Sequence, residues 1–180
     1  HNEIREGKDV FNKAVRTLKG LLRLKKAYTN LQVGTITTHM SQNQKSLEAI
    51  YDYLKTKIKP DAVTFALIRG AARRASAKNI DIGYYCRLNK KMEADYLKGK
   101  ISGFRKIFLW PVAVAAKILM HRLVIDTYRH GYQIPCLAGR LNAVIYANGD
   151  VYPCEMLTAR KIGNLRQVNF DFQKLWRSQK

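Results

Sequence analysis

The fold of the C-terminal part is decided by the stretch Cys136-Leu-Ala-Gly-Arg-Leu-Asn-Ala-Val-Ile-Tyr-Ala-Asn-Gly-Asp-Val-Tyr-Pro-Cys154. Asn148 and Gly149 lie between two short segments in which apolar residues alternate with others. This pattern is the strongest local signal for a β-hairpin closed by a two-residue type I′ turn. The sequence therefore predicts a hairpin with Asn148-Gly149 at its tip.

The predicted register places the two cysteines at related positions. With this turn, Ala147 pairs with Asp150, and Cys154 lies opposite Ala143, seven residues after Cys136. Both thiols could then reach one bound object. A glycine three residues after the first cysteine lets backbone N–H groups approach a thiolate. Spacing alone leaves three possibilities open: a metal or iron–sulfur site, two buried apolar thiols, or a disulfide.

The sequence limits which metal site these residues can form. A four-iron cluster needs about four thiolates, and the chain has 3 cysteines. A zinc site would have to recruit His130, His121 or His39, and no CxxC or HxxxH knuckle supports one. Cys86 has no partner in the sequence and is predicted to be structural. The hydrolase, nucleotide-binding and metalloprotease signatures GxSxG, GxxxxGK and HExxH are absent from the sequence.

The charge is strongly basic. The 33 Lys and Arg against 13 Asp and Glu give a net charge of +20, in a chain that is 47% hydrophobic. Such a field favours nucleic acid, anionic lipid or an acidic partner. The basic residues run from Arg5 to Lys180 without a nucleic-acid-binding signature, so dedicated nucleic-acid binding is not expected. The odd cysteine count and the lack of a visible secretory signal predict a reducing, cytoplasmic location.

Upstream of the hairpin, helix-like and strand-like segments alternate. Apolar spacing predicts helices over 9–27 and about 47–58, the second capped at Ser41 or Asn43, and strands over 31–38 and 62–68. Residues 80–85 fit either a further strand or the start of a helix that runs through Lys98. This alternation predicts βαβ units with a parallel sheet. Chemistry is then expected beyond the strand ends, at 37–39 and at Arg69.

Two further segments have simpler interpretations. Residues 107–116 are an apolar run interrupted by Pro111, too short to span a bilayer. A helix packed on the sheet and a helix on an anionic membrane surface both fit it. Near the end of the chain, 162–165 is predicted to be a tight turn. A short helix over about 170–176 is predicted to follow, capped by Asn169 or Asp171.

Taken together, the C-terminal motifs resemble a known family. The two cysteines with Gly149 between them, followed by Ile162-Gly-Asn-Leu165 and Leu175-Trp-Arg-Ser178, are similar to the opening half of the SPASM domain of radical S-adenosylmethionine enzymes. The resemblance implies that Cys136 and Cys154 begin the ligation of an auxiliary [4Fe–4S] cluster. It assigns residues 133–180 to the first half of that domain, a small β-hairpin plus a helix.

The upstream part resembles the partial (β/α)6 TIM-like barrel of the same enzymes. His1-Asn-Glu-Ile-Arg5 is similar to the family's His-Asp-x-x-Arg phrase, with Asn2 in place of Asp. The resemblance implies that Arg5 helps hold the carboxylate of S-adenosylmethionine. Residues 1–98 would be the late βα units of the barrel, and 99–132 a variable helical linker. Because two or three strands cannot close a barrel, the remaining strands are expected to precede His1.

The resemblance also implies a function. The parent enzyme would generate a 5′-deoxyadenosyl radical to modify a substrate, commonly a peptide or protein, with flavodoxin or ferredoxin as reductant. The CxxxCxxC loop for the catalytic cluster is absent from these 180 residues. We expect it upstream, and the remaining SPASM cysteines downstream, so the fragment alone should be inactive. The alternative is a basic module that binds nucleic acid or an anionic membrane surface and has structural cysteines.

Overall fold

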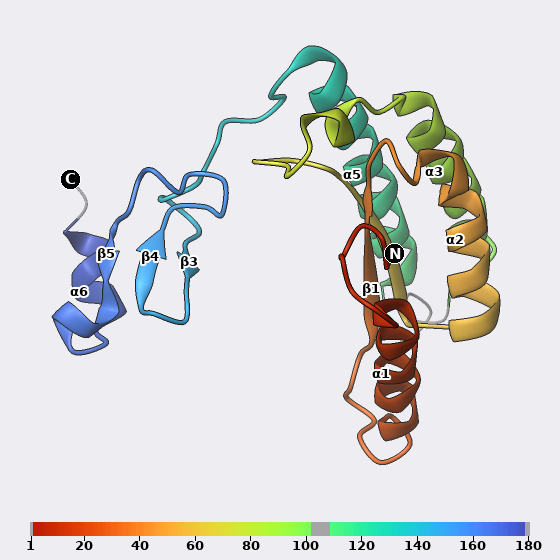
Figure 1. The fold of residues 1–180 in the computed structure, drawn as a ribbon, viewed down its shortest axis with the longest axis horizontal. Coiled ribbons are helices and arrows are strands. Elements are labelled where there is room, and N and C mark those ends of the chain that lie inside the picture. The colour runs from red at the N-terminus through yellow and green to blue at the C-terminus, as the bar shows by residue number, and fades with distance from the viewer. Residues whose placement is uncertain (1, 102–108, 179–180) are drawn as a thin grey trace. The chain divides into compact units, whose positions relative to one another are not determined.

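A computed structural model of the chain describes residues 2–101 and 109–178 (Figure 1). It has two compact units, His1–Arg129 and His130–Lys180, which are described separately. The first unit contains α1 (Val10–Leu24), β1 (Gly34–His39), α2 (Leu47–Tyr53), β2 (Ala62–Leu67), α3 (Ile82–Leu97) and α5 (Trp110–His130). A π-helical turn, Leu54–Ile58, extends α2, and short 3-10 turns lie at Gln44–Ser46 and Ala75–Lys78.

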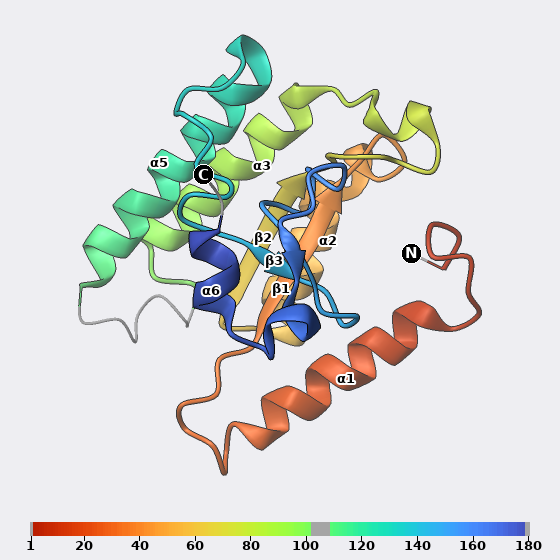
Figure 2. The same cartoon turned by 90° about the vertical axis from the view of Figure 1, so that its left-hand side faces the viewer.

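β1 and β2 form a parallel pair, with Gly34 opposite Ala62 and His39 opposite Leu67 (Figure 2). α2 connects the two strands, so the predicted βαβ unit is confirmed. Residues 80–98 contain α3 rather than a strand, which decides between the two interpretations of that segment. The chain is thus a mixed α/β protein with small sheets. No larger barrel is formed by the residues that the structure describes.

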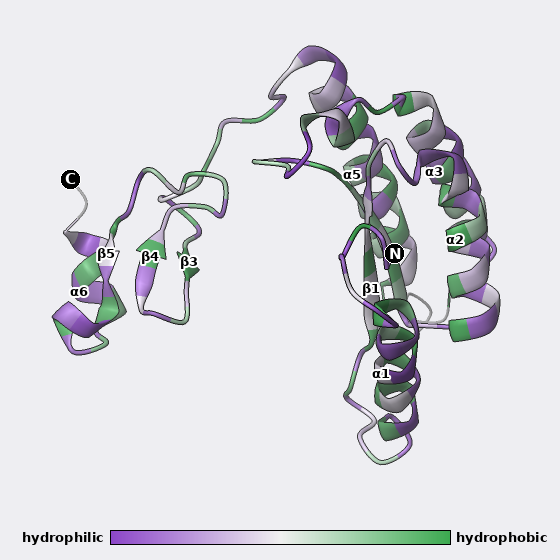
Figure 3. Cartoon of the chain, in the orientation of Figure 1, coloured by the Kyte–Doolittle hydropathy of each residue, from purple (hydrophilic) through white to green (hydrophobic). Residues whose placement is uncertain are grey.

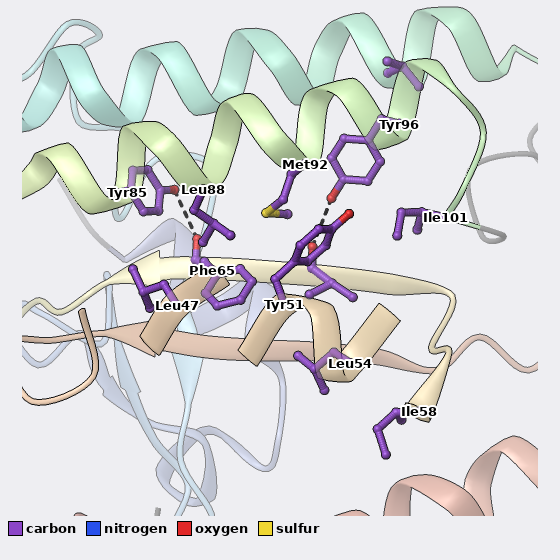
Figure 4. Packing of buried hydrophobic residues seen from close by; sticks show 12 residues of the cluster. Leu47, Tyr51, Leu54, Ile58, Phe65, Tyr85, Leu88, Met92, Tyr96 and Ile101 are labelled. Atoms are coloured by element: carbon purple, nitrogen blue, oxygen red, sulfur yellow. Dashed lines mark hydrogen bonds between the residues drawn. The ribbon is translucent and has the colours of Figure 1, made fainter. Parts of the chain in front are cut away.

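The core of the first unit lies between β2 and helices α2 and α3 (Figure 4). The hydroxyls of Tyr85 and Tyr96, on α3, donate hydrogen bonds to the carbonyls of Phe65 and Val63, both at 3.1 Å. Groups two residues apart on a strand point to the same edge. Ile68 N–H donates to the His39 carbonyl, so Ile68 and every second residue before it turn their backbone N–H and C=O groups toward β1. Val63 and Phe65 therefore turn their carbonyls toward the opposite edge. Tyrosines of α3 therefore cover the edge of β2 opposite β1.

The amphipathic helix predicted near the N-terminus is present as α1, with one apolar stripe (Figure 3). Val15, Leu18 and Leu22 pack against the core, although no residue of α1 is fully buried. The predicted cap of the next helix differs. Asn43 donates from Nδ2 to the Thr38 carbonyl and accepts from Met40 N–H instead of capping a helix. Its side chain therefore braces the loop that follows β1.

Part of the apolar run over 107–116 lies outside the described residues, because the structure describes the chain again from residue 109. α5 begins at Trp110, with Pro111 in its first turn, where proline is tolerated. Val114 is buried in the core of the first unit. Among the helices described, none is long and apolar enough to cross a membrane.

The second unit is a three-stranded antiparallel sheet followed by a helix. Its elements are β3 (Val144–Ile145), β4 (Asp150–Tyr152), β5 (Gly163–Asn164), a 3-10 turn (Leu165–Val168) and α6 (Phe172–Arg177). Its core is formed by Val151, Leu165 and Leu175. Asp171 caps α6, because its Oδ1 accepts a hydrogen bond from Lys174 N–H at 3.0 Å. Of the two predicted cap residues, Asn169 and Asp171, the second is therefore the cap.

The tight turn predicted over 162–165 is wrong, because two of its residues form β5. Gly163 pairs with Val151 and Asn164 with Asp150. Asn164 Nδ2 also donates to Asp150 Oδ1 at 2.7 Å, which fixes the strand in register. A Cβ on Gly163 would lie 2.4 Å from Leu175 Cδ1. The glycine therefore serves close packing of α6 against the sheet, which local turn chemistry does not reveal.

Candidate functional site

The hairpin between the cysteines has a three-residue loop, so the predicted two-residue type I′ turn is wrong. Val144 pairs with Tyr152 and Ile145 with Val151. Tyr146 N–H then donates to the Asp150 carbonyl at 2.9 Å, which leaves 147–149 as the loop. A type I′ turn needs positive φ at two successive residues, and here only Gly149 has it, at +88°.

Asn148 is the local cause of this geometry. Its Oδ1 accepts a hydrogen bond from Asp150 N–H at 3.0 Å. Such a bond from an asparagine side chain to the backbone two residues later stabilises a turn without positive φ at the asparagine. Gly149 alone then takes the left-handed conformation that closes a three-residue loop. The Asn-Gly pair predicted the position of the hairpin correctly and its loop length incorrectly.

The longer loop shifts the register by one residue and moves the position opposite Cys154. Continuing the observed pairing, Cys154 lies opposite Asn142 rather than Ala143. A shift of one residue exchanges the two faces of a strand. Asn142 itself joins the two cysteine segments, because its Nδ2 donates to the Pro153 carbonyl at 3.2 Å and its carbonyl accepts from Gly139 N–H at 3.0 Å.

Cys154 has a hydrogen-bonded sulfur. The thiol is half-buried, and its Sγ accepts a hydrogen bond from Met156 N–H at 3.4 Å. Leu157 N–H donates to the Cys154 carbonyl at 3.1 Å, so the sulfur lies at the start of a turn. Amide donors to sulfur stabilise a thiolate and are one of the factors that tune iron–sulfur clusters. The local structure at Cys154 is therefore suited to a thiolate ligand.

Cys136 lies in the segment that precedes the hairpin. Its side chain is exposed, whereas Cys154 and Cys86 are half-buried. None of the three cysteines forms a disulfide. Ala138, two residues later, forms a bridge with Asn142. The segments next to Cys136 and Cys154 also line one cavity of about 300 Å³, through Ala138 and Pro153 respectively. The structure thus brings the neighbourhoods of both cysteines to the same end of the hairpin.

Asp150, at the start of β4, binds the polar and charged side chains beside the hairpin. Lys161 Nζ lies 2.5 Å from its Oδ1, and Asn164 and Asn148 donate to the same carboxylate. The hydrogen bond from Lys161, followed by that from Asn164, lowers the pKa of Asp150. The carboxylate therefore stays ionised and connects β4 to β5 and to the hairpin loop.

A complete metal site is not formed by the residues that the structure describes. Over 2–101 and 109–178, no group of three His, Cys, Asp or Glu side chains is arranged to hold a metal ion. His39 and His121, weighed above as zinc ligands, are buried in the first unit. His39 stacks on Tyr85, and His121 Nδ1 lies 3.1 Å from Glu93 Oε1. Among the described residues, Cys136 and Cys154 therefore have no third metal ligand grouped with them.

Arg5 lies in the exposed loop before α1, and its side chain makes no ion pair or hydrogen bond with the described residues. Its neighbour Glu6 forms an ion pair with Arg73, in the loop that follows β2. The N-terminal loop is thereby held near the carboxyl end of β2, where the α/β architecture places chemistry.

Sequence reasoning did not predict that several polar residues are buried. His39 is fully buried at the end of β1, and both of its ring nitrogens are without a partner among the described residues. Burial lowers the pKa of His39, and Asp81 opposes that shift. Asp95 is buried beside Tyr51, Lys55 and Lys100. These partners lie far from it in the sequence, so no local pattern could have revealed them.

Comparison with known families bears on the cysteine-containing part. Residues 136–180, about a quarter of the chain, match the SPASM family, described as an iron–sulfur cluster-binding domain. No curated protein and no solved structure matches the chain. The match begins at Cys136 and includes the hairpin, Cys154, β5 and α6. Residues 136–180 therefore have the sequence of a SPASM domain, and this supports an iron–sulfur-binding role for that part of the chain.

Proposed function

We propose that this chain is a segment of a radical S-adenosylmethionine enzyme in which Cys136 and Cys154 bind an auxiliary [4Fe–4S] cluster. The observation that carries the proposal is that both thiols are free within a SPASM match. Asn142 connects their segments, and Met156 N–H donates to the Cys154 sulfur. The enzyme would form a 5′-deoxyadenosyl radical from S-adenosylmethionine and modify a peptide or protein substrate.

The two cysteines fit such a cluster as half of its ligands. A cubane cluster takes about four thiolates, and Cys86 lies in the first unit, on α3. The remaining ligands would come from residues outside this sequence. When bound, the cluster would supply electron transfer or a binding site at iron. This chain would contribute the two thiolates, the amide donor to Cys154 and the hairpin that positions them. The free thiols also support a reducing, cytoplasmic setting.

For residues 1–98 we propose the late βα units of a partial (β/α)6 barrel, and for 99–132 a linker. The parallel β1–β2 pair and its connecting α2 support this. The tyrosines that cover the far edge of β2 are consistent with a last barrel strand. In this arrangement Arg5 would bind the carboxylate of S-adenosylmethionine through its forked guanidinium.

The test is iron binding by the full-length enzyme that contains this segment. After anaerobic reconstitution, iron and sulfide are counted for the native protein, for Cys136→Ala/Cys154→Ala and for Cys86→Ala. We expect the double variant to lose about one cluster's worth of iron while Cys86→Ala keeps it, because Cys86 lies in the other unit. Equal iron content in all three proteins would refute the assignment.

The net charge of +20 favours a second candidate, a basic module for nucleic acid or an anionic membrane surface. Its signature would be an affinity for nucleic acid or for phosphatidylserine vesicles that falls steeply with salt. An affinity of this kind that persists in Cys136→Ala/Cys154→Ala, together with unchanged iron content, would favour this function over the enzyme.

A further inference from the structure

Three cationic residues are among those that line the cavity between the cysteine segments: Arg140, Arg160 and Lys161. Pro153 and Leu157 form part of its apolar wall. Neither cysteine lines it, and among the described residues that do, none is Asp or Glu. Its volume of about 300 Å³ is at the lower end of small-ligand pockets. The cavity thus gathers positive charge without an acidic residue in its lining.

The charges of the three cations are not equally compensated. Lys161 Nζ lies 2.5 Å from Asp150 Oδ1, so this charge is already paired. Neither Arg140 nor Arg160 forms an ion pair with a carboxylate within residues 2–101 and 109–178. The cavity lining therefore includes two arginines whose charge is not paired with a described carboxylate.

The backbone fixes where both arginines start. Arg140 N–H donates to the Leu137 carbonyl at 3.0 Å, and Arg160 N–H donates to the Leu157 carbonyl at 2.9 Å. Each arginine is thus the fourth residue of a tight turn. The first turn follows Cys136 directly, and the second begins three residues after Cys154. The same hairpin that positions the cysteines therefore also positions the backbone of the two arginines.

We propose that this cavity binds an oxyanion, a carboxylate or phosphate group of a small ligand, between Arg140 and Arg160. The planar guanidinium presents paired donors that match the oxygens of a carboxylate or phosphate. The apolar wall at Pro153 and Leu157 accommodates the carbon skeleton that bears the group. No cysteine is among the residues that line the cavity, so the metal-free chain presents the same lining residues and is used to test the site.

The experiment titrates the metal-free chain with pyrophosphate and, separately, with glutarate in 150 mM salt, followed by calorimetry and by the NMR shifts of the Gly139 and Lys161 amides. Saturable binding of pyrophosphate would identify a phosphate site, and saturable binding of glutarate a carboxylate site. Both results support the proposal. The absence of saturable binding by either anion would overturn it.

Charge-matched variants separate the cavity from the general field of a basic protein. We expect Arg140→Gln/Arg160→Gln to weaken binding at least tenfold. The control Lys174→Gln/Arg177→Gln removes two charges from α6, outside the cavity, and should change affinity less than twofold. An equal loss in both pairs would show that the field alone attracts the anion and would refute the site.

If Arg140→Gln/Arg160→Gln destabilises the second unit, the Val151 amide would exchange its hydrogen with solvent faster. Arg140→Lys/Arg160→Lys then takes the place of that variant, because it keeps the charge and removes the forked donors. The proposal requires at least a threefold loss of affinity in this variant. Unchanged affinity would contradict recognition by the guanidinium groups.

Discussion

Truncating Leu175 should unfold the hairpin that positions Cys154, although neither cysteine is changed. The core of the second unit has three buried residues, and Leu175, on α6, is 7% exposed. Its Cδ1 occupies the space that a Cβ on Gly163 would fill. Leu175→Ala therefore leaves a cavity between α6 and β5, because Gly163 has no side chain that could fill the gap.

The magnitude follows from burial and from the size of the unit. A buried Leu→Ala change costs about 2–5 kcal/mol. A unit of roughly 50 residues has a stability of about 2.5–7.5 kcal/mol at the usual value per residue. The substitution should thus remove most of the unfolding free energy of the second unit, and Cys154 would lose the hairpin that positions it.

The assay is amide hydrogen exchange in the second unit. The Ile162 amide donates to the Val151 carbonyl at 2.8 Å and reports on the sheet. A loss of 2 kcal/mol corresponds to about 30-fold faster exchange. The control is Leu141→Ala, because Leu141 is 76% exposed and should change stability by less than about 0.5 kcal/mol. If both variants exchange at the same rate, the three-residue core does not hold the unit together.

Three further changes test other parts of the structure. Gly149→Ala should lower the free energy of unfolding in urea by about 1–2 kcal/mol, and by more than Gly131→Ala does. A Cβ on Gly149 would lie 3.0 Å from Asn164 Oδ1, whereas a Cβ on Gly131 would have no atom within 4 Å. Equal losses in the two variants would show that this contact is unimportant. Burial lowers the pKa of His39, so the unfolded chain takes up the proton first, and stability should be full above about pH 6.5 and fall below it. His39→Leu should flatten that decline in urea unfolding between pH 5 and 8, and an unchanged slope would contradict it. Asp95→Asn should destabilise the first unit by about 3 kcal/mol in thermal unfolding, because it replaces a buried carboxylate that pairs with the half-buried Lys55 and the exposed Lys100 by a neutral group; a loss below about 1 kcal/mol would show that the ion pairs are unimportant.

Asp95 also shows how local charge is decided by packing. Burial alone would raise the pKa of its carboxyl, but hydrogen bonds from Lys55, Tyr51 and Lys100 together outweigh burial and lower it. Burial, reinforced by the hydrogen bond to Asp95, raises the pKa of Tyr51. The carboxylate is thus ionised and the phenol neutral at neutral pH. None of the four residues forms a recognisable motif in the sequence.

Sequence patterns predicted the elements whose cause is local. The strand predicted over 62–68 is present as β2, and the alternation of helix-like and strand-like segments predicted its parallel pairing with β1 correctly. Asp171 caps α6 as proposed, because an N-cap depends on residues three positions apart. The cysteine spacing and the residues around it were sufficient to indicate a SPASM domain, which the family match bears out for 136–180.

The two errors have different causes, one distant in the sequence and one local. Residues 162–165 have turn-like composition, but Gly163 and Asn164 form a strand because Asp150 and Leu175 bind and pack against them. The hairpin loop is one residue longer than predicted, because Asn148 bonds to the backbone of Asp150 instead of adopting positive φ. The first difference needs partners that are distant in the sequence, whereas the second is a choice between two local conformations of Asn148.

The sequence by itself determined where the two candidate thiols stand: on either side of an Asn-Gly hairpin, in a strongly basic chain. Residue type and spacing are sufficient for that, since thiolate chemistry and turn preference belong to the residues themselves. Only the tertiary structure decided that Asn142 joins the two cysteine segments and that Arg140 and Arg160 line one cavity. These relations depend on the register of the hairpin, and one residue of register exchanges the two faces of a strand.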